Sequence, residues 1–206
     1  MSGKHFQTSW QNISGDVMAK QKKKCSSFII FLLVCIIVAL SGKIVYETAL
    51  EFLYPKKYTE YVEYYAEEYG IDETLIYAVI RTESGFDPEA VSDADAIGLM
   101  QMTEETFDWL TMKTGEDYEF NDLFTPEVSI KYGTYFLSVL QNEYAITETV
   151  IAAYHAGMGN VSSWLDNPEH SDDGQNLKNI PISDTAHYVD KVMSAMDFYY
   201  KIYTEE

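Results

Sequence analysis

An uncharged segment near the N-terminus constrains the fold more than any other feature of this chain. It runs from Cys25 to Gly42, contains the apolar stretch FIIFLLVCIIVAL at 28–40, and follows a cluster of lysines at positions 20, 22, 23 and 24. These 18 residues are at the short end of what crosses a bilayer as a helix. Lysines on the N-terminal side favour a cytoplasmic N-terminus. We therefore expect a disordered cytoplasmic tail (1–24), a transmembrane or signal-anchor segment (25–43), a juxtamembrane connector (44–56) and an extracytoplasmic domain (57–206).

A cleaved signal peptide is the alternative reading of the same segment. Its apolar stretch has the length of the apolar core of a signal peptide. Ala39-Leu40-Ser41 is an acceptable small-residue cleavage site. The protein would then be secreted after cleavage near Gly42. We expect the retained anchor, with a single pass through the cell membrane.

The charges divide at the same place. Residues 1–43 carry six lysines and one acid, whereas residues 44–206 carry 8 basic and 32 acidic side chains. A domain this acidic is not suited to nucleic acid, because phosphate contacts need clustered lysine and arginine. Both cysteines, Cys25 and Cys35, lie in the apolar segment, so the domain must be stable without disulfides.

The rest of the chain has the pattern of an all-helical domain. Apolar residues recur at helical spacing, and strand signals are nearly absent. Asp72, Thr103 and Thr147 are placed to cap helices, Pro126 suits a first turn and Gly70 suits a helix end. We expect helices at about 57–69, 73–83, 103–113, 125–143, 147–156, 161–165 and 184–203, and the 86–97 loop allows a small β element.

One carboxylic acid stands at the boundary between a helix and a loop. Glu83 lies two residues after the apolar run LIYAVIR, and the turn residues Gly85, Asp87 and Pro88 follow it. A carboxyl at the end of a buried helix is partly desolvated, which raises its pKa towards neutrality and lets it hold a proton at working pH. Glu83 is therefore a candidate general acid.

Three ordered blocks of sequence carry a resemblance to a known family. They are ESGFDPEAVSDADAIGLMQM at 83–102, AAYHAGMGNVSSWL at 152–165 and, more weakly, IPISDTAHYVDKV at 180–192. Together they resemble the catalytic domain of the soluble-lytic-transglycosylase type, in the goose-type lysozyme superfamily. The resemblance implies a lysozyme-like helical fold that cleaves the MurNAc–GlcNAc bond of peptidoglycan.

The resemblance also implies roles for individual residues. Glu83 would protonate the glycosidic oxygen and then accept a proton from the 6-hydroxyl of the same MurNAc, which closes a 1,6-anhydro ring. The hydroxyl of Tyr154 is expected near that carboxyl. The expected substrate-binding residues are Ser92, Met100, Gln101, Tyr154, His155, Asp184 and Tyr188.

The sequence departs from the family pattern at several of these positions. His155 replaces the usual asparagine and adds a group that titrates near neutrality. Asp95 replaces a common loop glycine, which aspartate can tolerate because it adopts positive φ more readily than most residues. Asp184 is one methylene shorter than the usual glutamate. The histidines 155, 170 and 187 lack metal-site spacing, so we predict no metal and no cofactor.

Two other functions fit the same sequence. A hydrolytic muramidase would use the same fold, because water and the 6-hydroxyl compete for one intermediate. A non-catalytic glycan-binding or assembly scaffold would retain the substrate-binding groove of the family. The intact Glu83 disfavours this scaffold function. We expect peptidoglycan glycan strands and the membrane as partners.

Overall fold

The computed structural model describes residues 31–203. The chain divides into two compact units, one ending at Leu53 and the other beginning at Tyr54. The predicted tail at 1–24 and its lysines lie outside the described residues.

The first unit contains one described helix, Phe31–Leu53, of 23 residues. Its mean hydropathy of 1.9 makes it long and apolar enough to cross a membrane, a test that a signal sequence near an N-terminus also passes. The helix continues through most of the segment expected to be a connector, 44–56, so that this segment is helical as far as Leu53.

The second unit is built from helices. The α-helices are α2 (Thr59–Tyr69), α3 (Glu73–Glu83), α4 (Glu104–Thr114), α5 (Pro126–Glu143), α6 (Thr147–Ala156), α7 (Met158–Leu165) and α8 (Ser183–Tyr203). No strand forms within residues 54–203. The β structure in the loop after α3 consists of isolated bridges that pair Ile97 with Val91 and with Met102. The all-helical fold class predicted from the sequence is therefore confirmed.

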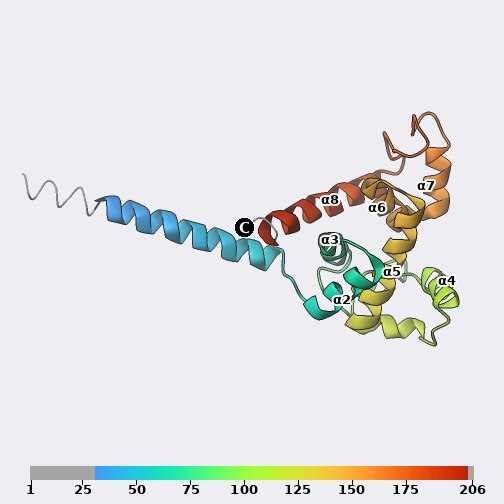
Figure 1. Ribbon diagram of the computed structural model, residues 1–206, viewed down its shortest axis with the longest axis horizontal. Helices are drawn as coiled ribbons and strands as arrows, with labels where there is room; N and C mark the ends of the chain where they lie inside the picture. The colour runs from blue at the N-terminus through green and yellow to red at the C-terminus, as the bar shows by residue number, and fades with distance from the viewer. Residues whose placement is uncertain (1–30, 204–206) are drawn as a thin grey trace, which may run out of the picture. The chain divides into compact units, whose positions relative to one another are not determined.

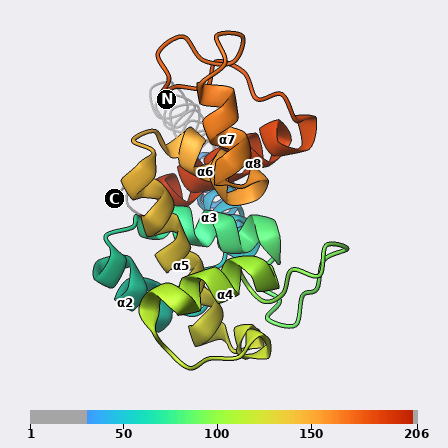
Figure 2. The same ribbon diagram turned by 90° about the vertical axis from the view of Figure 1, so that its right-hand side faces the viewer.

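Helix α3 is the centre of the second unit. Five consecutive residues, 76–80, are fully buried, as expected for a helix that is apolar on every face. It packs against α8 and α2, while α5 packs against α2 and α6. In Figures 1 and 2, α3 lies between α8 and α2. The C-terminal end of α3, and with it Glu83, is thus fixed from several sides.

Most of the predicted helix ends are confirmed. The Asp72 carboxylate accepts a hydrogen bond from the backbone N–H of Thr74 at 2.7 Å, and Thr103 accepts one from Thr106. Gly70 ends α2 in the left-handed conformation. The prediction for Thr147 is wrong: Ile146 occupies the N-cap position, Thr147 is the first helical residue, and no side chain caps α6.

One short helix was not predicted. Residues Phe120–Phe124 form a 3-10 helix, η1, whose Leu123 is fully buried. A capping box joins Glu119 and Asp122 at its start. Five residues are too few to show helical periodicity in a sequence.

Candidate active site

Glu83 is the last residue of α3, where the buried helix gives way to a loop. The next residue ties that loop down, because the Ser84 hydroxyl donates to the carbonyl oxygen of Leu99 at 2.8 Å. Gly85 and Phe86 both have positive φ, at 59° and 68°, and turn the chain away from the helix axis. The Glu83 carboxyl therefore has a fixed position at the boundary between the core and the loop.

Burial sets the acidity of this carboxyl. Desolvation raises the pKa of Glu83 from 4.5 to about 7. The Tyr188 hydroxyl opposes this effect, because it donates a hydrogen bond of 2.6 Å to Oε1 and so stabilises the carboxylate. Burial also raises the pKa of Tyr188 well above its ordinary value, which keeps the phenol protonated as a donor. Glu83 can thus both hold and release a proton near neutral pH.

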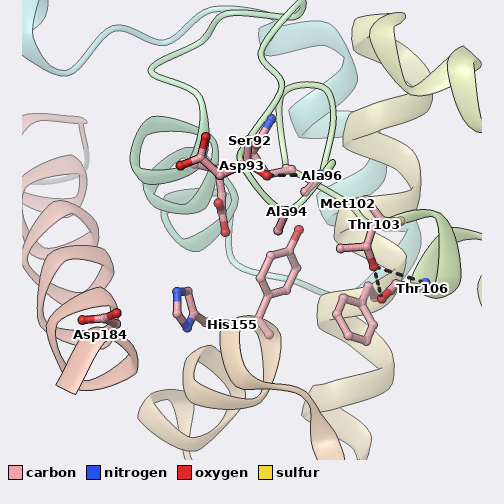
Figure 3. Close-up of a pocket in the computed structure, with 13 residues that line it drawn as sticks. Ser92, Asp93, Ala94, Ala96, Met102, Thr103, Thr106, His155 and Asp184 are labelled. Carbon is pink, nitrogen blue, oxygen red and sulfur yellow. Dashed lines mark hydrogen bonds between the residues drawn. The ribbon is translucent and has the colours of Figure 1, made fainter. Parts of the chain in front are cut away.

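Glu83 opens into a cavity of about 620 Å³. Figure 3 shows Asp184 and His155 on one side of this cavity and Thr103 and Thr106, at the start of α4, on the other. The lining residues are Glu83, Ser92, Asp93, Ala94, Ala96, Gln101, Met102, Thr103, Thr106, Phe136, Tyr154, His155 and Asp184. Five of the residues expected to bind substrate are therefore among them: Ser92, Gln101, Tyr154, His155 and Asp184.

The loop between α3 and α4 is ordered by two of these predicted residues. The Gln101 amide Nε2 donates to the carbonyl oxygens of Ala90 and Gly98, at 3.0 and 2.9 Å. The Ser92 hydroxyl accepts from the backbone N–H of Ala96 at 3.1 Å. Both side chains line the cavity while they shape the loop. The sequence argument that Asp95 tolerates positive φ also fits, since its φ is 58°.

One predicted substrate-binding residue needs correction. Met100 is fully buried and packs against Gly133, so its side chain belongs to the core and does not line the cavity. Its backbone is nevertheless involved, because the Tyr154 hydroxyl donates to the Met100 carbonyl oxygen at 2.7 Å. The hydroxyl hydrogen-bonded to Glu83 belongs to Tyr188. The expected closeness of Tyr154 to Glu83 stays a prediction. It fits a shared cavity and a Tyr154 pKa that is raised by burial and by the Glu83 charge.

His155 connects α6 to α8 next to Glu83. Its Nδ1 lies 3.1 Å from the Thr185 hydroxyl, and its ring centroid lies 4.4 Å from that of Tyr188. Desolvation lowers the pKa of His155, and the nearby Asp184 carboxylate partly offsets this. The imidazole therefore packs against the tyrosine that holds Glu83.

Several lining residues were missed from the sequence. Thr106 and Phe136 lie on α4 and α5, outside the three sequence blocks, and only the fold brings them to the cavity. Asp93 also lines the cavity, and its position next to Ser92 was the one signal available in the sequence. Within residues 31–203 there is no group of three or more His, Cys, Asp or Glu side chains that could hold a metal ion.

The helical fold, with a desolvated glutamate at the end of its central helix, defines a lysozyme-like domain. The chain belongs to the transglycosylase SLT domain family, whose model matches residues 60–177. The match ends before α8, so that Tyr188 and Asp184 lie beyond it.

Curated relatives and solved structures agree with this assignment. The chain is 41% identical over 116 residues to the membrane-bound lytic murein transglycosylase C of Photorhabdus laumondii, covering 51% of this chain and 32% of that protein. It is 35% identical over 170 residues to the protein of the same name from Serratia proteamaculans, covering 69% and 46%. The chain thus spans less than half the length of either relative.

The fold resembles that of the 70 kDa soluble lytic transglycosylase from Escherichia coli. The TM-score is 0.69 at 26% identity, covering 76% of this chain and 26% of that one. The lytic transglycosylase Slt from Pseudomonas aeruginosa, solved as an inactive mutant, gives 0.66 at 27% identity with the same coverage. The lysozyme-like fold expected from the sequence is therefore confirmed.

Proposed function

We propose that this protein is a lytic transglycosylase that cleaves the MurNAc–GlcNAc bond of peptidoglycan. The observation that carries the proposal is the half-buried, desolvated Glu83, with a pKa of about 7, hydrogen-bonded to Tyr188 and open to a cavity of about 620 Å³. The names of the curated relatives and of the solved structures support the same activity.

The chemistry needs one group that acts first as an acid and then as a base. Protonated Glu83 gives its proton to the glycosidic oxygen, and the bond from that oxygen to the anomeric carbon breaks. The resulting carboxylate accepts the proton of the MurNAc 6-hydroxyl, whose oxygen bonds to the anomeric carbon. The product is a 1,6-anhydro sugar, and Glu83 ends the cycle protonated. The step consumes no water.

A pKa near 7 suits both halves of this cycle. At neutral pH an ordinary glutamate is almost wholly ionised and could not act as the acid. Burial keeps a large fraction of Glu83 protonated, and the Tyr188 hydroxyl steadies the carboxylate once the proton has left. Tyr188 acts through Glu83, so we assign it as a positioning residue.

Mass spectrometry of the soluble products from purified peptidoglycan tests the proposal. Fragments ending in 1,6-anhydro-MurNAc are expected. Reducing MurNAc ends would instead identify a hydrolytic muramidase. If the folded protein leaves the glycan uncleaved, the remaining candidate function is that of a non-catalytic binding scaffold.

Tyr188→Phe is expected to move the alkaline limb of the pH profile upward. The variant lacks the hydrogen bond that lowers the pKa of Glu83, so that pKa rises above about 7 and the acid form persists to higher pH. The measurement is kcat/KM against pH, with Tyr200→Phe on the same helix as a control, because Tyr200 is exposed. An alkaline limb that stays in place or moves downward would contradict the role given to Tyr188.

We further propose that the helix Phe31–Leu53 anchors the protein in the cell membrane, with the catalytic domain outside. Its length and hydropathy, the lysines before it and the membrane-bound relatives support this arrangement. Protease added to intact, wall-stripped cells should digest the catalytic domain. A mature N-terminus near Gly42 would point to a cleaved signal peptide.

A further inference from the structure

A second cavity continues the catalytic one between α4 and α7. It has a volume of about 350 Å³ and is lined by Glu105, Thr106, Trp109, Phe136, Gly157 and Met158. Thr106 and Phe136 line both cavities, so the two adjoin. Figure 3 shows Thr106 at the α4 side of the catalytic cavity, the side opposite Asp184 and His155.

The aromatic side chains form a row that leads into this second cavity. The ring centroids of Tyr154 and Phe136 are 5.2 Å apart, and those of Phe136 and Trp109 are 6.3 Å apart with the rings nearly perpendicular at 84°. The Lys113 ammonium lies 4.6 Å from the Trp109 centroid, over the ring. These contacts fix the orientation of a half-buried indole at the far end of the row.

We propose that Trp109 is the platform of a sugar-binding subsite, where a pyranose ring of the glycan strand packs beyond the bond being cleaved. This inference rests on the proposed function and names a part of its substrate-binding surface. A glycan polymer must continue past the cavity where its bond breaks, and this adjoining cavity offers it an oriented aromatic ring. The axial C–H groups of a pyranose pack against such a ring as other apolar surfaces do.

The charges around Trp109 favour the sugar backbone over the peptide stems. The stems carry carboxylates, whereas the cavity is bordered by Glu105, and Glu104 precedes it on the same turn of α4. The nearby cation, Lys113, stacks on the indole. An uncharged GlcNAc ring meets no repulsion here, whereas an anionic stem, or the lactyl carboxylate of a stem-free MurNAc, would.

Binding to glycan strands tests this subsite separately from catalysis. The full chain is studied in detergent, in a Glu83→Gln background, by titration calorimetry with glycan strands whose peptide stems have been removed by an amidase. Trp109→Ala should weaken binding by about tenfold, the loss typical of an oriented aromatic contact. Trp109→Phe, which keeps a smaller ring, should lose less.

Met112→Ala is the matched control, because Met112 is on the same helix, is 77% exposed and lines neither cavity. Its affinity should equal that of the parent. Equal binding by Trp109→Ala and the parent would overturn the subsite while leaving the proposed function standing. If Trp109→Ala lowers the affinity only for strands that carry peptide stems, the occupant of the subsite is the stem and not the sugar, which would overturn the proposal. Failure of the Glu83→Gln parent to bind any glycan would overturn both proposals.

Discussion

Glu83→Gln should lower the rate of glycan cleavage by about 100- to 10,000-fold, the usual contribution of general acid–base catalysis. The amide keeps the size of the side chain but cannot deliver a proton to the glycosidic oxygen. The measurement is the release of soluble fragments from purified peptidoglycan at pH 7. Glu89→Gln is the control, because Glu89 is exposed and does not line the cavity. Near-normal turnover by folded Glu83→Gln protein would end the mechanism proposed above.

The same variant should also change how stability depends on pH. The folded pKa of Glu83 is raised from 4.5 to about 7, so the folded state binds this proton more tightly than the unfolded state. That contribution to stability is complete below pH 4.5 and is lost as the pH rises through 7. It amounts to about 3 kcal/mol. Thermal melts should therefore show a relative gain for Glu83→Gln at pH 8 compared with pH 4, and a constant difference would contradict the desolvation of Glu83.

Gly98→Ala should destabilise the domain by more than about 3 kcal/mol. Gly98 has a φ of 78°, and a Cβ atom added there would lie 2.2 Å from the Leu123 carbonyl oxygen and 3.0 Å from the Ser129 hydroxyl. The Leu123 carbonyl oxygen belongs to the backbone of η1, so it cannot relieve the clash by a rotamer change as a side chain could. Thermal melts of the full chain in detergent measure the loss.

Gly85→Ala separates the clash from the backbone conformation. Gly85 also has a positive φ, of 59°, but an added Cβ meets nothing within 4 Å. Its loss should be limited to about 1–2 kcal/mol, the cost of a left-handed alanine. If both variants lose the same free energy of unfolding, the close approach of Gly98 to η1 does not contribute to the destabilisation.

The helices could be predicted because their signals are local. Asp72 and Thr103 cap the helices that follow them, and the buried face of α3 appears as a run of apolar residues. Thr147 carries the same local signal as a capping residue, yet the helix begins one position earlier than that signal suggests. A serine or threonine near a helix start fits the N-cap and the first turn alike, so the sequence could not separate them.

The candidate site could be predicted only in part, because it joins segments far apart in the sequence. The three blocks supplied Glu83, Ser92, Gln101, Tyr154, His155 and Asp184, which do line one cavity. They could not reveal which tyrosine reaches the carboxyl, since Tyr188 is 105 residues away from Glu83 along the chain. Nor could they reveal that Met100 faces inward, because apolar residues of a loop serve the core and a ligand equally well.

The last helix, α8, also holds the beginning of the second unit. The Tyr199 hydroxyl donates to the Pro55 carbonyl oxygen at 3.1 Å, and the Tyr203 hydroxyl donates to that of Tyr54 at 2.8 Å. The same helix carries Tyr188 three turns earlier. A soluble form of the protein should therefore start at Tyr54, and not at residue 60 where the family match begins. The shorter form would lack the two carbonyl oxygens to which the hydroxyls of Tyr203 and Tyr199 donate. Equally, a truncation before Tyr199 would release residues 54–55 and shorten the helix whose Tyr188 is hydrogen-bonded to Glu83.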